Sequence, residues 1–314
     1  MIVGIALSPS LDVTYTVERL HGIQRPLDIV RVAGGKSLNA VRAAAALGVE
    51  RAAAAAVLAG GAGTDVASHA RAHGIDLRVI DGRAPTRTCI SVFDLATREL
   101  TEIYEHAVAV TDDEVERALA AAVEAMGDAP GWFLLSGGMS ADHARRAVRR
   151  VRDAGGLIAL DTHGPALAAG LDEGPDLVKV NRAEAVELLG CAVDLAGDQL
   201  VTALHERASE GSTGARTIVT DGPDGAWARD VDRVVHARSS GPLGGFPVGS
   251  GDSFLGGLVA ALDTGEALAG ALALASGAGI ANAQVPGAAV LDPVLARRLA
   301  SRVDVVGGSA NAMR

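Results

Sequence analysis

Short apolar segments alternate with amphipathic segments along most of the chain, and this order predicts the fold class. Apolar runs typical of buried strands occupy residues 2–7, 131–135, 157–160, 176–180 and 217–220. Helical spacing of apolar residues predicts helices between them, over residues 112–126, 141–154, 182–189 and 195–210. Strands that alternate with helices build a parallel sheet with helices on both faces. We therefore expect an α/β protein, a three-layer α/β/α sandwich with a mostly parallel central sheet.

Two segments, residues 12–33 and 87–105, interrupt this alternation. In the second, Thr88, Ile90 and Val92 alternate as in a strand, and neither segment contains a helical pattern. We expect these strands to form a small β-sheet that projects from the main body as a lid. Because no long Pro- or Ser-rich linker divides the chain, residues 1–314 are expected to form a single domain that includes this lid.

Three further segments complete the predicted secondary structure, and two of them allow more than one interpretation. Residues 51–57 contain five consecutive alanines, which favour a helix, but their length and position favour a strand, and we predict a strand. A helical pattern continues through residues 250–283, followed by a final helix and a short strand over 302–306. The least polar stretch, residues 267–285, is mostly Ala and Gly and includes Asn282 and Gln284, so a buried helix is favoured over a membrane span.

Composition and charge exclude several classes of protein. A hydrophobic content of 49% with 21% charged residues is that of a globular chain, which excludes disorder. The net charge of -10 is spread without a basic run, and only 3% of residues are aromatic, so we expect no nucleic-acid partner. Two cysteines, Cys89 and Cys191, cannot build a disulfide framework. No basic segment precedes the first apolar run, so we expect a cytoplasmic protein without a signal peptide or membrane partner.

A glycine-rich segment, Gly249-Ser250-Gly251-Asp252, stands directly before an amphipathic helical pattern. Small residues at a helix start leave its first N–H groups open to an anion, which the helix dipole also attracts. Asp252 has two interpretations. It is an ordinary N-cap, or it is a general base that takes a proton from an acceptor hydroxyl while the N–H groups hold a transferring phosphoryl group.

A second glycine pair, Gly34-Gly35, precedes Lys36 and another helical pattern of small residues. The Walker A pattern does not fit, because it requires a glycine five positions before Gly35, where Val30 stands. Adjacent glycines allow the backbone to approach a ligand closely, with Lys36 and Asn39 able to bond hydroxyls or a phosphate. The alternative is a plain turn from strand to helix.

Taken together, the two glycine segments resemble the two signatures of the PfkB (ribokinase-like) family of carbohydrate kinases. The resemblance covers essentially the whole chain and is strongest toward the branch of 1-phosphofructokinases and tagatose-6-phosphate kinases. Further matches to that branch, in chain order, are Leu11-Asp12-Val13-Thr14, Thr86-Arg87-Thr88, Thr101-Glu102-Ile103, Lys179-Val180-Asn181-Arg182-Ala183-Glu184 and Asp221-Gly222-Pro223-Asp224-Gly225-Ala226.

The resemblance implies a ribokinase-like fold, ATP and Mg²⁺ as cofactors, an optional monovalent cation and a homodimer formed through the lid. It implies Asp252 as the catalytic base, with Gly249, Ser250 and Gly251 as the anion hole. The implied sugar-side residues are Asp12, Gly34, Gly35, Lys36, Asn39, Arg87, Ser136 and Gly137. Among these, Arg87 and Lys36 would hold the phosphate already on the substrate.

On the ATP side, the resemblance implies a second set of binding residues. These are Lys179, Asn181, Glu184, Thr220, Gly222, Gly225 and Asn282. Glu184 would hold Mg²⁺ indirectly, through water or phosphate, and Asn282 would lie close to the adenine.

Three departures from the pattern of the branch concern the substrate side. Ser8-Pro9-Ser10 replaces the usual Asn-Pro-Ala, and Ser37 replaces a glycine, which places a side chain where the backbone was free to approach. After Thr101-Glu102-Ile103, the usual Asn-Glu-Pro-Gly is replaced by Tyr104-Glu105-His106-Ala107, and we expect Tyr104 and His106 on the lid, near the sugar.

The function that the resemblance implies is ATP-dependent phosphorylation of a phosphorylated ketohexose, of the fructose 1-phosphate or tagatose 6-phosphate type. One alternative is a kinase for an unphosphorylated sugar or a nucleoside. The alternative from another class is a non-catalytic regulator that binds a sugar phosphate or a nucleotide.

Overall fold

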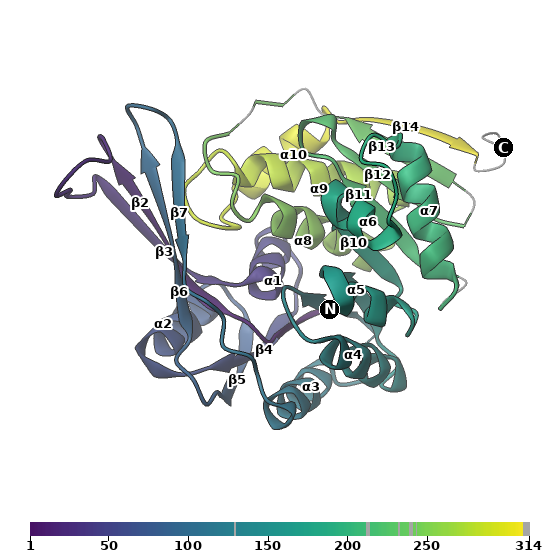
Figure 1. The fold of residues 1–314 in the computed structure, drawn as a ribbon, viewed down its shortest axis with the longest axis horizontal. Coiled ribbons are helices and arrows are strands. Elements are labelled where there is room, and N and C mark those ends of the chain that lie inside the picture. Colours follow the sequence, from purple (N-terminus) through teal and green to yellow (C-terminus); the bar gives the residue numbers. More distant parts are fainter. Residues whose placement is uncertain (129, 212–213, 232, 239–240, 243, 310–314) are drawn as a thin grey trace.

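The computed structural model describes residues 1–128, 130–211, 214–231, 233–238, 241–242 and 244–309 (Figure 1). Ten strands form the main sheet, in the order β14 (Asp304–Ser309), β13 (Arg233–Arg238), β12 (Ala226–Arg229), β11 (Arg216–Thr220), β10 (Leu177–Asn181), β9 (Leu157–Asp161), β8 (Trp132–Ser136), β1 (Ile2–Ala6), β4 (Ala52–Leu58) and β5 (Asp76–Asp81). The strands from β5 to β11 are parallel, and β12, β13 and β14 add an antiparallel edge. The mostly parallel sheet is therefore confirmed.

Helices cover both faces of this sheet, so the three-layer arrangement is also confirmed. One apolar cluster joins the sheet to α1 (Lys36–Ala46), α2 (Gly60–Ala72), α8 (Ser250–Asp263) and α9 (Leu268–Asn282). A second cluster joins the opposite face to α3 (Asp112–Met126), α4 (Ala141–Asp153), α5 (Gly164–Leu171) and α7 (Gly197–Ser209). The short helix α6 (Arg182–Leu189) follows β10, and α10 (Pro293–Ala300) packs beside α9.

The alanine run at residues 52–56 is a strand, as predicted. Ala52, Ala54 and Ala56 belong to the apolar cluster on one face of the sheet, whereas Ala53 and Ala55 belong to the cluster on the other. Every residue of β4 is buried, because helices lie on both faces. Burial on both faces removes the polar alternation that would otherwise mark a strand.

The continuous helical pattern over residues 250–283 was expected to be one helical region, and it is two helices. α8 ends at Asp263, and α9 begins at Leu268. Between them the chain turns at Gly265, whose φ of 81° lies in the left-handed region that favours glycine. The two helices then pack against each other, and α9 is the buried helix expected from the least polar stretch. Among the described residues, no helix is long and apolar enough to cross a membrane.

A separate four-stranded sheet forms the predicted lid and projects from one end of the molecule (Figure 1). Its order is β3 (Asp28–Gly34), β2 (Ser10–Val17), β6 (Arg87–Asp94) and β7 (Leu100–Tyr104). Register places Asp12 opposite Cys89 and Cys89 opposite Tyr104, so these three side chains share one face. The opposite face carries apolar side chains, including Ile29 and Ile103.

Candidate active site

The start of α8 lies at the end of the glycine-rich segment and offers unpaired backbone N–H groups. Gly249 is the N-cap, with φ 80° and ψ -1°, and no side chain caps this helix. A Cβ at Gly249 would lie 2.3 Å from the backbone nitrogen of Ala289, so only glycine fits here. The N–H groups of Gly251 and Asp252, in the first turn, have no partner within the helix. This is the geometry of an anion site.

Asp252 is the third residue of α8, so it is not the N-cap that one interpretation expected. Its side chain is buried, and its Oδ2 accepts a hydrogen bond of 2.8 Å from Nδ2 of Asn39 on α1. Burial, followed by the charge of Asp161, raises the pKa of Asp252 to about 6, although Lys36 opposes the rise. A carboxylate with such a pKa can accept a proton at neutral pH.

A charge cluster of the half-buried Lys36 with the buried Lys179 and Asp161 lies beside Asp252. The Nζ of Lys179 on β10 is 2.8 Å from Oδ2 of Asp161, and the Nζ of Lys36 is 3.3 Å from Oδ1. Burial disfavours ionisation of Asp161, but Lys179 and Lys36 outweigh it and lower its pKa. A Cβ at Gly251 would lie 3.2 Å from the Nζ of Lys179, so this ammonium group stands at the start of α8. The cations and the anion site therefore adjoin.

Sequence reasoning missed Asp161. The residue ends β9 and is fully buried, with its carboxylate between the two lysines. Ligand sites of parallel α/β sheets lie at the carboxyl ends of the strands. An acidic residue at the end of a predicted apolar strand was therefore the signal that could have found it.

The glycine pair at residues 34–35 meets the lid strand β2 directly. A Cβ at Gly34 would lie 2.1 Å from Cγ of Asp12, and Gly35 has a φ of 94° with Pro9 close by. Asp12 accepts a hydrogen bond of 2.6 Å from the hydroxyl of Ser10, and burial raises its pKa. These glycines therefore allow the Asp12 carboxylate to lie against the start of α1, on the cleft side.

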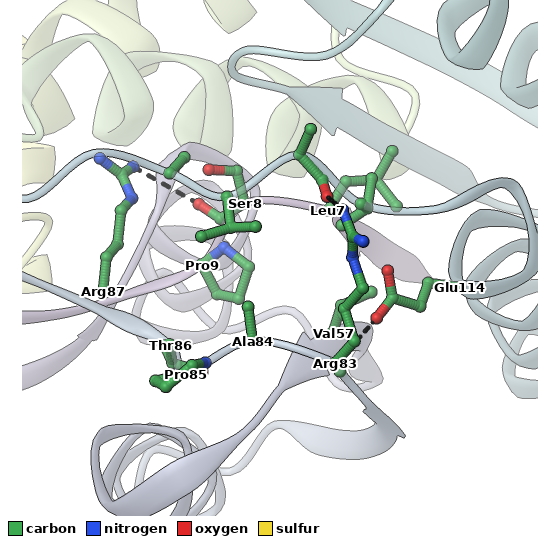
Figure 2. Close-up of a pocket in the computed structure, with 15 residues that line it drawn as sticks. Leu7, Ser8, Pro9, Val57, Arg83, Ala84, Pro85, Thr86, Arg87 and Glu114 are labelled. Carbon is green, nitrogen blue, oxygen red and sulfur yellow. Dashed lines mark hydrogen bonds between the residues drawn. The ribbon is translucent and has the colours of Figure 1, made fainter.

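Arg87 lines a cavity at the base of the lid (Figure 2). Its guanidinium group points toward the carbonyl of Ser8, at 3.5 Å, and among the described residues its buried Nε has no partner. The cavity measures about 40 Å³, far below the roughly 300 Å³ of a usual ligand pocket. It can therefore enclose only a small group, such as one phosphate, rather than a whole sugar.

Lys36 was expected beside Arg87, at the phosphate of the substrate, and the described contacts place it elsewhere. Its ammonium group pairs with Asp161 and lies 4.0 Å from a carboxylate oxygen of Glu184. These contacts place it beside Asp161 and the start of α6. Arg87, in contrast, contacts the loop that follows β1.

Comparison with known proteins identifies the family of the chain. The family model described as pfkB family carbohydrate kinase matches residues 1–294. The chain belongs to the pfkB family of carbohydrate kinases. As a member, it is a phosphotransferase that acts on an alcohol group.

Three solved structures share the fold of this kinase. Phosphofructokinase-2 from Escherichia coli in complex with potassium is 23% identical, with 96% of this chain and 98% of that chain covered and a TM-score of 0.85. A "possible 1-phosphofructokinase" from Thermotoga maritima is 21% identical, with 98% and 99% covered and a TM-score of 0.81. Ribokinase from Arabidopsis thaliana, complexed with ribose and ATP, is 18% identical, with 95% and 98% covered and a TM-score of 0.71. Together they show the ribokinase-like fold.

The residues expected on the nucleotide side of the kinase follow β10 and β11. Asn181 and Glu184 form a reciprocal capping box at the start of α6. Thr220 ends β11, and its hydroxyl donates to the carbonyl of Val180 at 3.4 Å. Gly225 has a φ of 91°, and a Cβ there would lie 2.0 Å from the carbonyl oxygen of Ala237. The turn Gly222–Asp224 between them is also held by the ion pair of Arg182 with Asp221, at 2.6 Å.

Asn282 was expected near the adenine, and its position argues against that contact. The side chain is fully buried, and its Nδ2 donates to the carbonyls of Phe246 and Val248 and to the hydroxyl of Ser250. Asn282 therefore holds the segment before the anion site in place. A Cβ at Gly244 would lie 1.8 Å from the carbonyl oxygen of Ala283, which explains one glycine of that segment.

The donor set of the kinase fits an indirectly held Mg²⁺. Among the described residues, no group of three or more His, Cys, Asp or Glu side chains could enclose a metal ion. Mg²⁺ is commonly held by one or two carboxylates together with water and substrate phosphates. Glu184, with its side chain 15% exposed beside Lys36, offers such a carboxylate.

Two of the departures, at Ser37 and at residues 104–107, can now be placed, together with the candidates Ser136 and Gly137. Ser37 was expected to place a side chain where the backbone was free to approach. The side chain is buried, and its hydroxyl donates to the carbonyl of Ile5 at 2.8 Å and accepts from the N–H of Ser136. Tyr104 shares the Asp12 face of the lid and donates to the carboxylate of Glu102, whereas His106 lies beyond β7. The two remaining candidates are neighbours in the chain. Ser136 has a buried hydroxyl without a partner among the described residues, and the N–H of Gly137 donates to the carbonyl of Asp161.

Replacing Asp161 by Asn should lower the free energy of unfolding by about 3 kcal/mol, because it leaves the buried Lys179 without its partner. Chemical denaturation measures this loss. The matched control is Asp142→Asn, which breaks an exposed ion pair with Arg146 and should cost less than about 1 kcal/mol. Equal losses in the two variants would contradict the assignment of a buried, coupled charge cluster.

Proposed function

We propose that this kinase transfers the terminal phosphoryl group of ATP to a hydroxyl of a phosphorylated ketohexose, of the fructose 1-phosphate or tagatose 6-phosphate type. The observation that carries the proposal is the position of Asp252. Its carboxylate lies in the first turn of α8, beside free N–H groups and the ammonium group of Lys179. A proton acceptor and an anion site are thus adjacent, as phosphoryl transfer requires.

In the proposed reaction, the acceptor hydroxyl attacks the terminal phosphorus of ATP. As the new P–O bond forms, the P–O bond to ADP breaks, and the hydroxyl proton passes to the carboxylate of Asp252. The segment Gly249-Ser250-Gly251 would hold the charge on the transferring group through backbone N–H groups. Lys179, fixed by Asp161, adds a positive charge at the same place.

Residues on the two sides of this centre would position the substrates. Mg²⁺, when bound through Glu184, neutralises charge on the phosphates of ATP. Asn39 and Asp12 would bind hydroxyls of the sugar. The remaining residues proposed for the nucleotide are Asn181, Thr220, Gly222 and Gly225. Activation by a monovalent cation stays a prediction.

A phosphorylated substrate is supported by Arg87. Arg87 is one of the residues that line a cavity of about 40 Å³, and its buried Nε is left without a partner among the described residues. A buried donor without an acceptor is costly, so an anion that fills the cavity would stabilise it. A neutral sugar or a nucleoside offers this donor hydroxyl oxygens but no negative charge. We therefore favour a phosphosugar over these alternatives.

We further propose a homodimer formed through the lid. The apolar face of the lid exposes Ile29 and Ile103, by 40% and 60%. Ile29 and Ile103 lie on β3 and β7, the two edge strands of the lid, and exposed apolar side chains gathered on one face are typical of an interface. Phosphofructokinase-2 from Escherichia coli, one of the structural neighbours, has a tetrameric inhibited form.

Replacing Asp252 by Asn should lower kcat by about 100-fold or more and leave the affinity for ATP nearly unchanged, because only the proton acceptor is lost. Release of ADP over a panel of sugars and sugar phosphates with Mg-ATP measures this effect. In the unchanged enzyme, kcat should fall as the pH drops through about 6, where Asp252 becomes protonated.

The matched control is Asp263→Asn, at the other end of α8, which should keep its kcat. Retained turnover in Asp252→Asn would remove Asp252 from the base role. A chain that is stabilised by ATP or sugar phosphates but turns over none of them would instead be a non-catalytic regulator.

Replacing Arg87 by Ala should raise KM for phosphorylated sugars by about 30-fold or more, because a buried charged donor to the phosphate is lost. KM for unphosphorylated sugars should change little. Steady-state kinetics on matched pairs of sugars, with and without phosphate, make each neutral sugar the control. If both values of KM change alike, the phosphosugar proposal loses its support.

Replacing Ile103 by Glu should convert the proposed dimer to a monomer, because it places a charge in the apolar contact. Sedimentation equilibrium measures the molecular mass. Val294→Glu on α10 is the control, since Val294 is an exposed apolar residue outside the lid, 74% exposed against 60% for Ile103, and should leave the dimer intact. A monomeric unchanged protein would contradict the proposal.

A further inference from the structure

Arg42 on α1 is a buried arginine directly behind the candidate active site, with 2% of its surface exposed. It donates to the amide oxygen of Asn39 at 2.8 Å, to the carbonyl of Ala289 at 3.4 Å and to the carbonyls of Ala33 and Ala288. These partners are all neutral oxygens. Burial lowers the pKa of Arg42 to about 10, which still leaves it charged at neutral pH.

A buried charge that contacts only neutral groups needs a compensating charge nearby, because removing it from water is costly. Two carboxylates supply that compensation at longer range, those of Asp12 and Asp252. These are the proposed sugar ligand and the proposed base. Arg42 therefore interacts at longer range with both acidic groups of the proposed sugar site, and its described hydrogen bonds include no direct ion pair with either.

The hydrogen bond to Asn39 fixes the orientation of its amide. Since a guanidinium group has only donors, it can contact only the oxygen of the Asn39 side chain. The amide NH₂ must then face the other way, where it donates to Oδ2 of Asp252 at 2.8 Å. The reversed amide would place its NH₂ against the guanidinium group of Arg42 and its oxygen against the carboxylate of Asp252, and neither pair can form a hydrogen bond. Arg42 thus determines that Asn39 donates to Asp252.

The other bonds of Arg42 reach the backbone around the anion site. Its guanidinium group holds the carbonyls of Ala288 and Ala289, and Ala289 has an unusual positive φ of 49°. The same two residues pack against Gly249, where a Cβ would lie 2.3 Å from the nitrogen of Ala289. A further bond goes to the carbonyl of Ala33, next to the first glycine pair. One side chain therefore joins both glycine-rich segments.

We propose that Arg42 is a positioning residue for phosphoryl transfer: through Asn39 it fixes the carboxylate of Asp252, and through the carbonyls of residues 288 and 289 it holds the anion site in register with that carboxylate. The inference rests on the proposed function. It assigns a role to a residue that would touch neither ATP nor the sugar.

The charges around Asp252 define what loss of Arg42 should do to the pH dependence. Lys36 and Arg42 face it from α1, Lys179 faces it from β10 and Asp161 faces it from β9. Removal of one of three cations leaves the carboxylate less stabilised. The pH at which kcat falls should therefore move upward.

The test compares Arg42→Gln with Arg297→Gln. Arg297 also bonds a backbone carbonyl, that of Leu47 at 2.7 Å, but it lies on α10, outside the proposed site. In Arg42→Gln, kcat should fall by about 100-fold, because small displacements of reacting groups have effects of that size. KM for ATP should change by less than about threefold, and the acidic limb of the kcat profile should move to higher pH. Arg297→Gln should keep the kcat and the pH profile of the unchanged enzyme.

Arg42→Lys keeps the charge and carries the test if Arg42→Gln does not fold. One ammonium group cannot reach Asn39 and the carbonyls of Ala288 and Ala289 together, so kcat should fall by about tenfold. Because the charge is kept, the acidic limb of the kcat profile should shift less than in Arg42→Gln. Folded variants whose kcat and pH profile match those of Arg297→Gln would overturn the inference. Absence of turnover in the unchanged protein would instead overturn the proposed function, and the positioning role of Arg42 with it.

Discussion

The candidate site depends on keeping a buried carboxylate available for ionisation. Asp252 is surrounded by protein, and burial favours its neutral form. Its hydrogen bond from Asn39 and the positive charges of Lys36 and Lys179 act in the opposite direction. The result is a group that titrates near neutrality rather than one that stays protonated. The side chains around it, from α1, β9 and β10, therefore set the pKa of Asp252 by opposing effects.

Close approach of backbone segments makes that balance attainable. A Cβ at Gly256 on α8 would lie 2.3 Å from the carbonyl oxygen of Ala40 on α1, so these two helices pack with almost no side chain between them. Close packing at this point places Asn39 against Asp252. Gly34 does the same for the lid strand, since any side chain there would displace Asp12. The high content of Gly is therefore partly a requirement of the site and not only of the turns.

The alternation of strands and helices was readable from the sequence because each buried strand is short, apolar and bounded by turn residues. The bounds of α3 and α6 were predicted to the residue, and both begin with a capping box. The break at Gly265 was missed because small residues on both sides continue the helical spacing. The orientation of Ser37 and the position of Asp161 depend on which strand ends lie side by side, and no local pattern reports that. The burial of Asn282 depends likewise on contacts distant in sequence, with the segment that precedes α8. The pairing of Lys36 with Asp161 joins residues 125 positions apart.

The lysines of the site are held in place before any phosphate arrives. Lys179 and Lys36 are paired with Asp161, which is itself enclosed by the ends of β9 and β10. Electrostatic stabilisation is effective when the charges need no reorganisation during the reaction. Two lysines without a partner would each have to lose side-chain freedom and water as ATP binds. Pairing with the buried Asp161 places this loss in the folding of the chain. The ion pair that joins the ends of β9 and β10 thus also sets the position of a positive charge that phosphoryl transfer needs.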